Sequence, residues 1–132
     1  MSSSSPLVLL GRAFLDGSIR PDCAVSVVDD RIVFVGPRAD LAMPADARVV
    51  DVGDGIVSPG FVDLHVHGYG GCMAEDDPVA MAQAIVRGGT TYFLPTVLTN
   101  DLDVMVTAAE RVRDALGHMP GGATIGGLHL EG

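Results

Sequence analysis

The spacing of apolar and polar residues changes character along the chain. Short apolar runs bounded by glycine, proline and aspartate fill the first part, and they predict strands at residues 7–10, 13–15, 24–28, 32–35 and 48–52. Asp29 and Asp30 lie between two of these runs at the spacing of a two-residue hairpin turn. We therefore expect residues 1–57 to form a small antiparallel sheet that is one half of a β-sandwich.

From Pro59 onward, strand patterns alternate with helix patterns. Strands are predicted at residues 61–67, 91–96 and 124–131, with a helical stretch in each interval between them. The first helix should have Asp77 as its N-cap and Pro78 at its first position, and it should end at Gly88-Gly89. This alternation is typical of parallel βαβ units. Residues 58–132 are thus expected to form an α/β domain.

The second helix should take Asn100 as its cap and end at Gly117. One apolar stripe, which we expect to face the core, is formed by Leu102, Met105, Val106, Ala109, Val112 and Leu116. His118 follows the helix, where a positive charge is favourable. We assign it no chemistry.

The predicted strand at residues 61–67 carries the first candidate chemistry. Side chains alternate along a strand, so one face should hold Asp63, His65 and His67 and the other Val62, Leu64 and Val66. Residues i and i+2 rise only about 6–7 Å apart, so both imidazoles could lean onto one metal ion. A lone His-x-His pattern is equally compatible with two ordinary strand histidines.

A second strand ends in the same kind of residue. Within residues 124–131, Leu128 and Leu130 should face one way and His129 and Glu131 the other. If both strands belong to one parallel sheet, their carboxyl ends share an edge, and Glu131 can reach an ion held by His65 and His67. The alternative for Glu131 alone is a solvated carboxylate at a strand end.

Composition narrows the class of protein. The chain has 132 residues, of which 48% are hydrophobic and 19% charged, as in folded globular domains. The net charge is −9, and the eight basic residues are all arginine, which disfavours binding to nucleic acid or to anionic membranes. No apolar run approaches the roughly 20 residues of a membrane span, and no signal peptide is recognised, so a cytoplasmic location is expected.

Two residue types are informative by their scarcity. Cys23 and Cys72 are far apart and form no C-x-x-C pair, so neither a disulfide framework nor a cysteine zinc site is supported. The chain contains no lysine, which excludes a Schiff-base lysine or a carbamylated-lysine metal bridge within these residues.

Three segments resemble a known family. Residues 57–67, Val-Ser-Pro-Gly-Phe-Val-Asp-Leu-His-Val-His, resemble the first barrel strand of the amidohydrolase superfamily. Residues 127–132, Gly-Leu-His-Leu-Glu-Gly, resemble the third-strand motif of one branch, the N-acetylglucosamine-6-phosphate deacetylases, and residues 88–96 are similar to the same branch. The resemblance implies that residues 58–132 are the first three strands and two helices of a metal-dependent (β/α)8 barrel, a fold of about 250 residues when complete.

The resemblance also implies roles for individual residues. Glu131 would be the principal metal ligand, in the place of the modified lysine of other branches, and His65 and His67 would be further ligands of a divalent ion, zinc or iron. Asp63 would give them support, and His129 matches a motif position without an assigned role. The loop glycines Gly68, Gly70 and Gly71 are compatible with close approach to substrate or with a simple turn.

The implied reaction is hydrolysis of the acetamide of N-acetylglucosamine 6-phosphate to glucosamine 6-phosphate and acetate, in amino-sugar catabolism, by a protein expected to be a homo-oligomer at full length. The catalytic aspartate of the family would lie beyond Gly132, so this chain alone is expected to be inactive. Two alternatives stay open: another amidohydrolase that acts on a cyclic amide or imide, and a metal-free structural module without catalysis.

Overall fold

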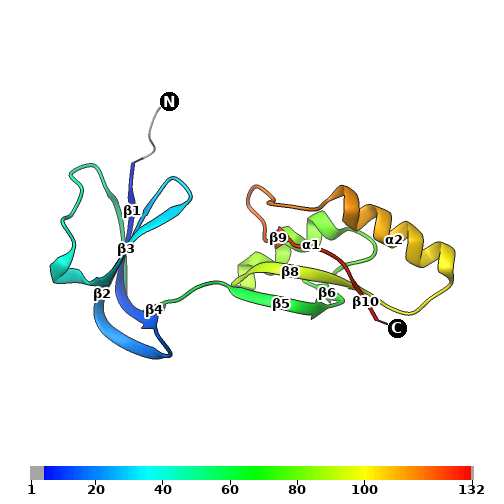
Figure 1. The fold of residues 1–132 in the computed structure, drawn as a ribbon, viewed down its shortest axis with the longest axis horizontal. Helices are drawn as coiled ribbons and strands as arrows, with labels where there is room; N and C mark the ends of the chain where they lie inside the picture. The colour runs from blue at the N-terminus through cyan, green and yellow to red at the C-terminus, as the bar shows by residue number, and fades with distance from the viewer. Residues whose placement is uncertain (1–4, 132) are drawn as a thin grey trace. The chain divides into compact units, whose positions relative to one another are not determined.

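Residues 5–131 are described by the computed structural model, in which one unit ends at Pro59 and a second begins at Gly60 (Figure 1). The first unit contains, in chain order, β1 (Leu7–Leu15), β2 (Ser18–Val28), β3 (Arg31–Pro37), the 3-10 turn η1 (Arg38–Asp40) and β4 (Arg48–Val57). The predicted strands 7–10 and 13–15 are thus joined in one longer strand, β1.

The four strands of the first unit form one sheet in the order β3-β2-β1-β4. Strands β1, β2 and β3 pair antiparallel, as predicted, but β4 pairs parallel with β1. The expectation of a wholly antiparallel sheet is therefore wrong for β4. Its physical cause is the connection over residues 38–47, which returns the chain to the start of β1 instead of reversing it in a hairpin.

The hairpin between β2 and β3 is confirmed. Val28 pairs with Arg31, which leaves Asp29 and Asp30 as a two-residue turn, and Asp29 has the left-handed φ of 54° that such turns require. One apolar cluster of this unit consists of the buried residues Val8, Leu10 and Ala24, with Phe34, Leu41 and Ala47 packed against it.

The second unit is built around β8. Its elements are β5 (Phe61–Val66), β6 (Gly68–Tyr69), β7 (Cys72–Met73), α1 (Pro78–Ile85), the 3-10 turn η2 (Val86–Gly88), β8 (Thr90–Val97), α2 (Leu102–Asp114), β9 (Thr124–Ile125) and β10 (His129–Leu130). Strand β8 pairs with β5, and it also pairs with β9 and β10 in succession. All these pairings are parallel, as the alternation of strands and helices predicts.

The third predicted strand is interrupted. One strand was expected over residues 124–131, whereas the structure has the two short strands β9 and β10 with residues 126–128 between them. A Cβ at Gly126 would overlap the ring of Tyr92, so the chain passes that ring at a glycine. The ladder resumes where His129 pairs with Thr96.

Helix α1 has the predicted ends. The Asp77 carboxylate accepts a hydrogen bond of 2.9 Å from the backbone N–H of Ala80, and Pro78 occupies the first helical position. After η2, Gly89 takes a left-handed φ of 92° and ends the helical segment.

Helix α2 differs from its prediction at both ends and in its buried face, and it ends at Asp114 instead of the predicted Gly117. It begins after Asp101 rather than Asn100, whose side chain instead accepts a hydrogen bond from the Asp101 N–H. The buried face is formed by Ala108, Val112 and, just past the helix, Ala115, whereas Leu102 is 74% exposed. Of the predicted stripe, Val112 is buried while Leu102, Val106 and Leu116 are exposed, so the buried face is rotated from the predicted one.

One apolar cluster joins both helices to the sheet in the second unit. It consists of Ala74, Met81, Ala82, Ile85, Phe93, Val112, Ala115, Ala123 and Ile125.

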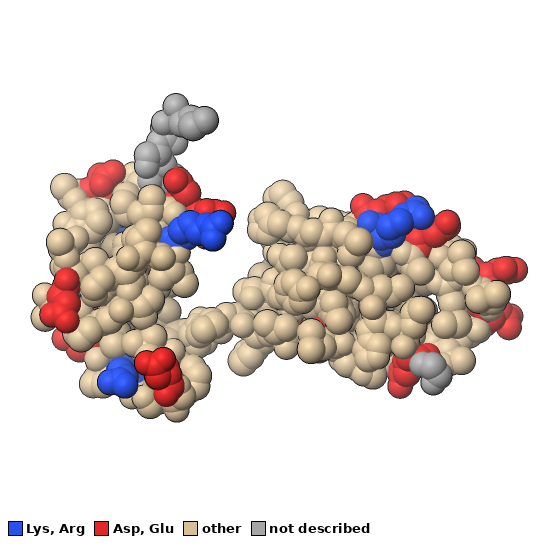
Figure 2. Space-filling model, viewed as in Figure 1, with Lys and Arg blue, Asp and Glu red and all other residues tan. Residues whose placement is uncertain are grey.

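Most of the surface in Figure 2 belongs to residues that are neither acidic nor basic. Among the helices of residues 5–131, none has the length and apolarity needed to cross a membrane.

Candidate metal centre

The three predicted ligands come from the carboxyl ends of parallel strands. His65 is the penultimate residue of β5, His67 follows that strand directly, and Glu131 follows β10 (Figure 1). Because β5 and β10 both run parallel to β8, their carboxyl ends meet at the same edge of the sheet. The topology therefore brings a histidine pair and a carboxylate together, although His67 and Glu131 are 64 positions apart in sequence.

The ligand atoms converge on a small volume. His65 Nε2 lies 3.1 Å from His67 Nε2, and the Glu131 Oε2 atom lies 3.2 Å from His67 Nε2 and 3.7 Å from His65 Nε2. Tetrahedral zinc, with bonds of about 2.0–2.2 Å, separates its donor atoms by about 3.3 Å. The three distances thus fit a shared cation.

The chemistry of the donor set also fits a divalent metal. Two imidazole nitrogens with one carboxylate oxygen suit zinc or iron. The three side chains are between 33% and 48% exposed, so the group is open on one side and could accept further ligands. His67 Nδ1 is buried and has no hydrogen-bond partner within residues 5–131.

The backbone around His65 departs from regular pairing. The register of β5 against β8 shifts between Asp63 and Val66. There the Asp63 carboxylate accepts a hydrogen bond of 3.1 Å from the His65 N–H, and the buried Thr96 hydroxyl accepts one of 3.0 Å from the Val66 N–H. Side chains thus replace part of the ladder on either side of the first histidine, which gives Asp63 a defined supporting contact.

Glu131 is held through both of its backbone polar groups. Its N–H donates to the Val97 carbonyl at 3.1 Å, and its carbonyl accepts a hydrogen bond of 2.8 Å from the Thr99 hydroxyl. Both partners lie at the end of β8 or just beyond it. The backbone that carries the Glu131 carboxylate is therefore fixed by two hydrogen bonds.

Thr96 and Thr99 were not singled out from the sequence. Both follow Pro95 at the carboxyl end of β8, where polar residues in a parallel sheet gather near a site. Their position at or just beyond the end of that strand is the sequence feature that points to them. His129, which matched a motif without a role, places its Nδ1 atom 3.0 Å from the Leu64 carbonyl and its ring against His65.

The glycine-rich loop after His67 forms a tight hairpin of β6 and β7. Gly70 and Gly71 occupy its turn with φ values of 61° and 85°, and a Cβ at Gly68 would come within 2.8 Å of the opposite strand. Cys72 in this hairpin packs against the apolar cluster. The glycines are thus explained by the turn itself.

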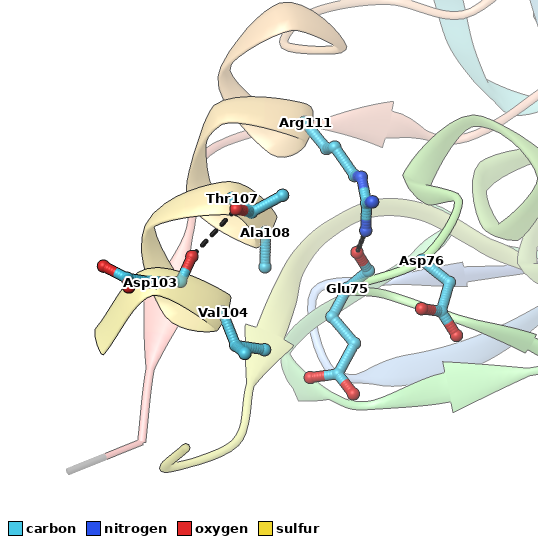
Figure 3. Close-up of a pocket in the computed structure, with 7 residues that line it drawn as sticks. All are labelled: Glu75, Asp76, Asp103, Val104, Thr107, Ala108 and Arg111. Carbon is cyan, nitrogen blue, oxygen red and sulfur yellow. Dashed lines mark hydrogen bonds between the residues drawn. The ribbon is translucent and has the colours of Figure 1, made fainter. Parts of the chain in front are cut away.

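A separate hollow of about 340 Å³ lies between α2 and the turn before α1 (Figure 3). Its lining consists of Glu75, Asp76, Asp103, Val104, Thr107, Ala108 and Arg111. The Arg111 guanidinium donates a hydrogen bond of 2.9 Å to the Glu75 carbonyl. None of the predicted metal ligands lines this hollow.

Known proteins resemble the chain over nearly its whole length. It is 34% identical over 127 residues to an N-acetylgalactosamine-6-phosphate deacetylase of Shewanella, a match that covers 92% of this chain and 32% of that enzyme. The crystal structure of N-acetylglucosamine-6-phosphate deacetylase from Pasteurella multocida matches with a TM-score of 0.78 and 26% identity, over 96% of this chain and 34% of that one. The resemblance to the amino-sugar-phosphate deacetylases is confirmed.

The similarity of the chain extends beyond the deacetylases. An imidazolonepropionase of Solibacter usitatus is 42% identical over 114 residues, which cover 79% of this chain and 27% of that enzyme. No family model matches the chain. The chain spans about a third of the length of the deacetylases that it matches.

Proposed function

We propose that the chain is the N-terminal part of a metal-dependent deacetylase that acts on an N-acetylated amino-sugar 6-phosphate, with N-acetylglucosamine 6-phosphate as the first candidate substrate. The observation that carries this proposal is the convergence of His65, His67 and Glu131 within 4.8 Å. The names of the deacetylase relatives supply the substrate class. Because this chain covers only about a third of their length, we attribute the complete reaction to a longer protein that carries it.

The proposed fold extends what residues 5–131 contain. Strands β5 and β8, with β9 and β10 together as the third, would open a (β/α)8 barrel, and the four-stranded sheet of β1 to β4 would be one half of a β-sandwich. The carboxyl ends of barrel strands are where active sites of this fold lie. The positions of the three ligands agree with that rule.

The residues of this chain would hold the metal ion. When bound, a divalent ion polarises a carbonyl and lowers the pKa of water toward neutrality. His65, His67 and Glu131 would bind it, Asp63 and Thr99 would fix the backbone of two of these ligands, and the open side of the group would admit the acetamide. Glu131 would take the ligand role that a modified lysine has elsewhere, in agreement with the absence of lysine.

Two functions would fall to the rest of the protein. Amide hydrolysis needs a group that moves a proton to the leaving nitrogen, and we propose an aspartate outside residues 5–131 for it. The 132 residues alone are accordingly expected to release no acetate. Phosphate would be bound by arginine or by backbone amides of this chain, which has no lysine, or by residues of the rest of the protein.

Metal content and acetate release test the proposal in the longest protein that carries this chain. We expect about one zinc or iron per protein, and release of acetate from N-acetylglucosamine 6-phosphate or its galactosamine isomer. Glu131→Gln should lose both metal and activity. The matched control is Glu110→Gln, an exposed residue of α2 whose carboxylate lies 3.9 Å from Arg113. A protein that retains no metal would favour the non-catalytic module.

A hydrolase of a cyclic amide is the second candidate, because an imidazolone is a cyclic amide and an imidazolonepropionase is among the relatives. His65 and His67 serve both alternatives, whereas the third-strand glutamate is expected only in the deacetylase. Hydrolysis of cyclic amides by the parent, with metal retained in Glu131→Gln, would favour this second candidate.

A further inference from the structure

His129 reaches across the sheet from β10 to β5. Strand β8 lies between these two strands, yet the Nδ1 atom of His129 is 3.0 Å from the backbone carbonyl oxygen of Leu64. A carbonyl oxygen can only accept a hydrogen bond, so the proton of this bond must reside on Nδ1. The contact therefore fixes the tautomer as well as the direction of the His129 ring.

The ring of His129 also packs directly against a predicted ligand. Its centroid lies 4.6 Å from that of His65, with the ring planes at 79°. On its other flank His65 meets His67, with centroids 5.0 Å apart and an angle of 73°. Edge-to-face contacts at these separations are favourable for aromatic rings. His65 is thus held by two imidazoles.

The peptide group between Leu64 and His65 is bound by side chains at both of its polar ends. Its carbonyl, from Leu64, accepts from His129, and its N–H, from His65, donates to Asp63. The two groups of a trans peptide point in opposite directions, so these contacts fix the peptide plane from both sides. This happens where β5 and β8 lose regular register.

We propose that His129 is a positioning residue, which fixes the peptide and the ring of His65 so that His65 Nε2 faces Glu131 and the shared metal ion. The inference rests on the proposed metal site. His129 itself stands outside the group of three residues whose ligand atoms converge. Partners of metal-bound histidines typically change metal affinity by about 10- to 100-fold.

Two substitutions separate the two contacts of His129. His129→Asn keeps a side-chain N–H near the position of Nδ1 but removes the ring, whereas His129→Phe keeps a ring beside His65 but removes the donor. His118→Asn is the matched control, because His118 is an exposed histidine of the same unit. Zinc affinity is measured by competition with a chelator, and ligand geometry by the visible absorption of the cobalt(II) form.

We expect each His129 variant to bind zinc about tenfold or more weakly and to shift the cobalt spectrum, and His118→Asn to match the parent. In the metal-free parent, nitrogen NMR of the ring should find the His129 proton on Nδ1. Should His129→Phe fail to fold, as judged by circular dichroism, His129→Asn decides the question. Parental affinity and spectrum in the folded variants would overturn the inference.

The failure of the proposed function would look different. A parent protein that binds no zinc overturns the metal site and with it the role of His129. A Glu131→Gln variant that binds zinc with unchanged affinity overturns Glu131 as a ligand, and with it the orientation of His65 toward a shared ion that we assign to His129. Zinc binding that is lost in Glu131→Gln but unchanged in both His129 variants overturns the role of His129 alone.

Discussion

The hydroxyl of Thr99 donates a hydrogen bond of 2.8 Å to the backbone carbonyl of Glu131. It is a side-chain contact from the segment after β8 to the residue that follows β10. Thr99→Val removes the donor at nearly constant volume and should free the Glu131 backbone on that side. We expect zinc affinity to fall by about tenfold. Competition with a chelator measures the change.

Thr99→Ser is the control for this effect. Serine retains the hydroxyl and loses only a methyl group, so its zinc affinity should stay within about threefold of the parent. Equal affinities for the valine and serine variants, both with parental stability, would show that the carboxylate needs no anchor from Thr99.

Asp63 offers a second test of the site. Its carboxylate accepts the His65 N–H at 3.1 Å, a contact that an asparagine oxygen can also make. Asp63→Ala should therefore weaken zinc binding by about tenfold, whereas Asp63→Asn should largely preserve it. Isothermal titration with zinc compares the two. If both variants lose affinity equally, the charge of Asp63, and not its hydrogen bond, is what matters.

The convergence of His65, His67 and Glu131 was predictable because a strand has a simple period. Alternation alone assigned His65 and His67 to one face, and the parallel arrangement of strands then assigned Glu131 to the same edge. The ends of the helical segment were equally predictable, since the Asp77 side chain, the ring of Pro78 and the left-handed Gly89 act only on neighbouring residues. Such features need no knowledge of distant segments.

Apart from the ends of α2, the errors concern relations between distant segments. The direction of β4 depends on the path of residues 38–47, and the buried face of α2 depends on the other segments of its apolar cluster. The break before β10 depends on Tyr92, which is 34 positions from Gly126 in sequence. The contacts of His129 and Thr99 likewise join segments far apart in sequence, so neither periodicity nor spacing predicts them.

The cap of α1 gives a prediction about stability. Asp77→Ala removes the acceptor for the Ala80 N–H and should lower the free energy of unfolding by about 1 kcal/mol. Asp77→Ser should retain most of it, because serine also caps helices well. Urea denaturation measures both. Asp76→Ala, at the exposed neighbouring position, is the control, and an equal loss there would argue against a specific cap.

The third predicted strand is interrupted at Gly126, where the backbone passes close to the ring of Tyr92. A Cβ at this position would overlap the ring, so Gly126→Ala must push Tyr92 aside and should cost about 1–2 kcal/mol of unfolding free energy. The ring is the stated cause, so the cost should fall by more than half in a Tyr92→Leu background. Urea denaturation of the parent, the two single variants and the double variant forms a double-mutant cycle. An unchanged cost in the leucine background would mean that the backbone at Gly126, rather than the ring, excludes a side chain.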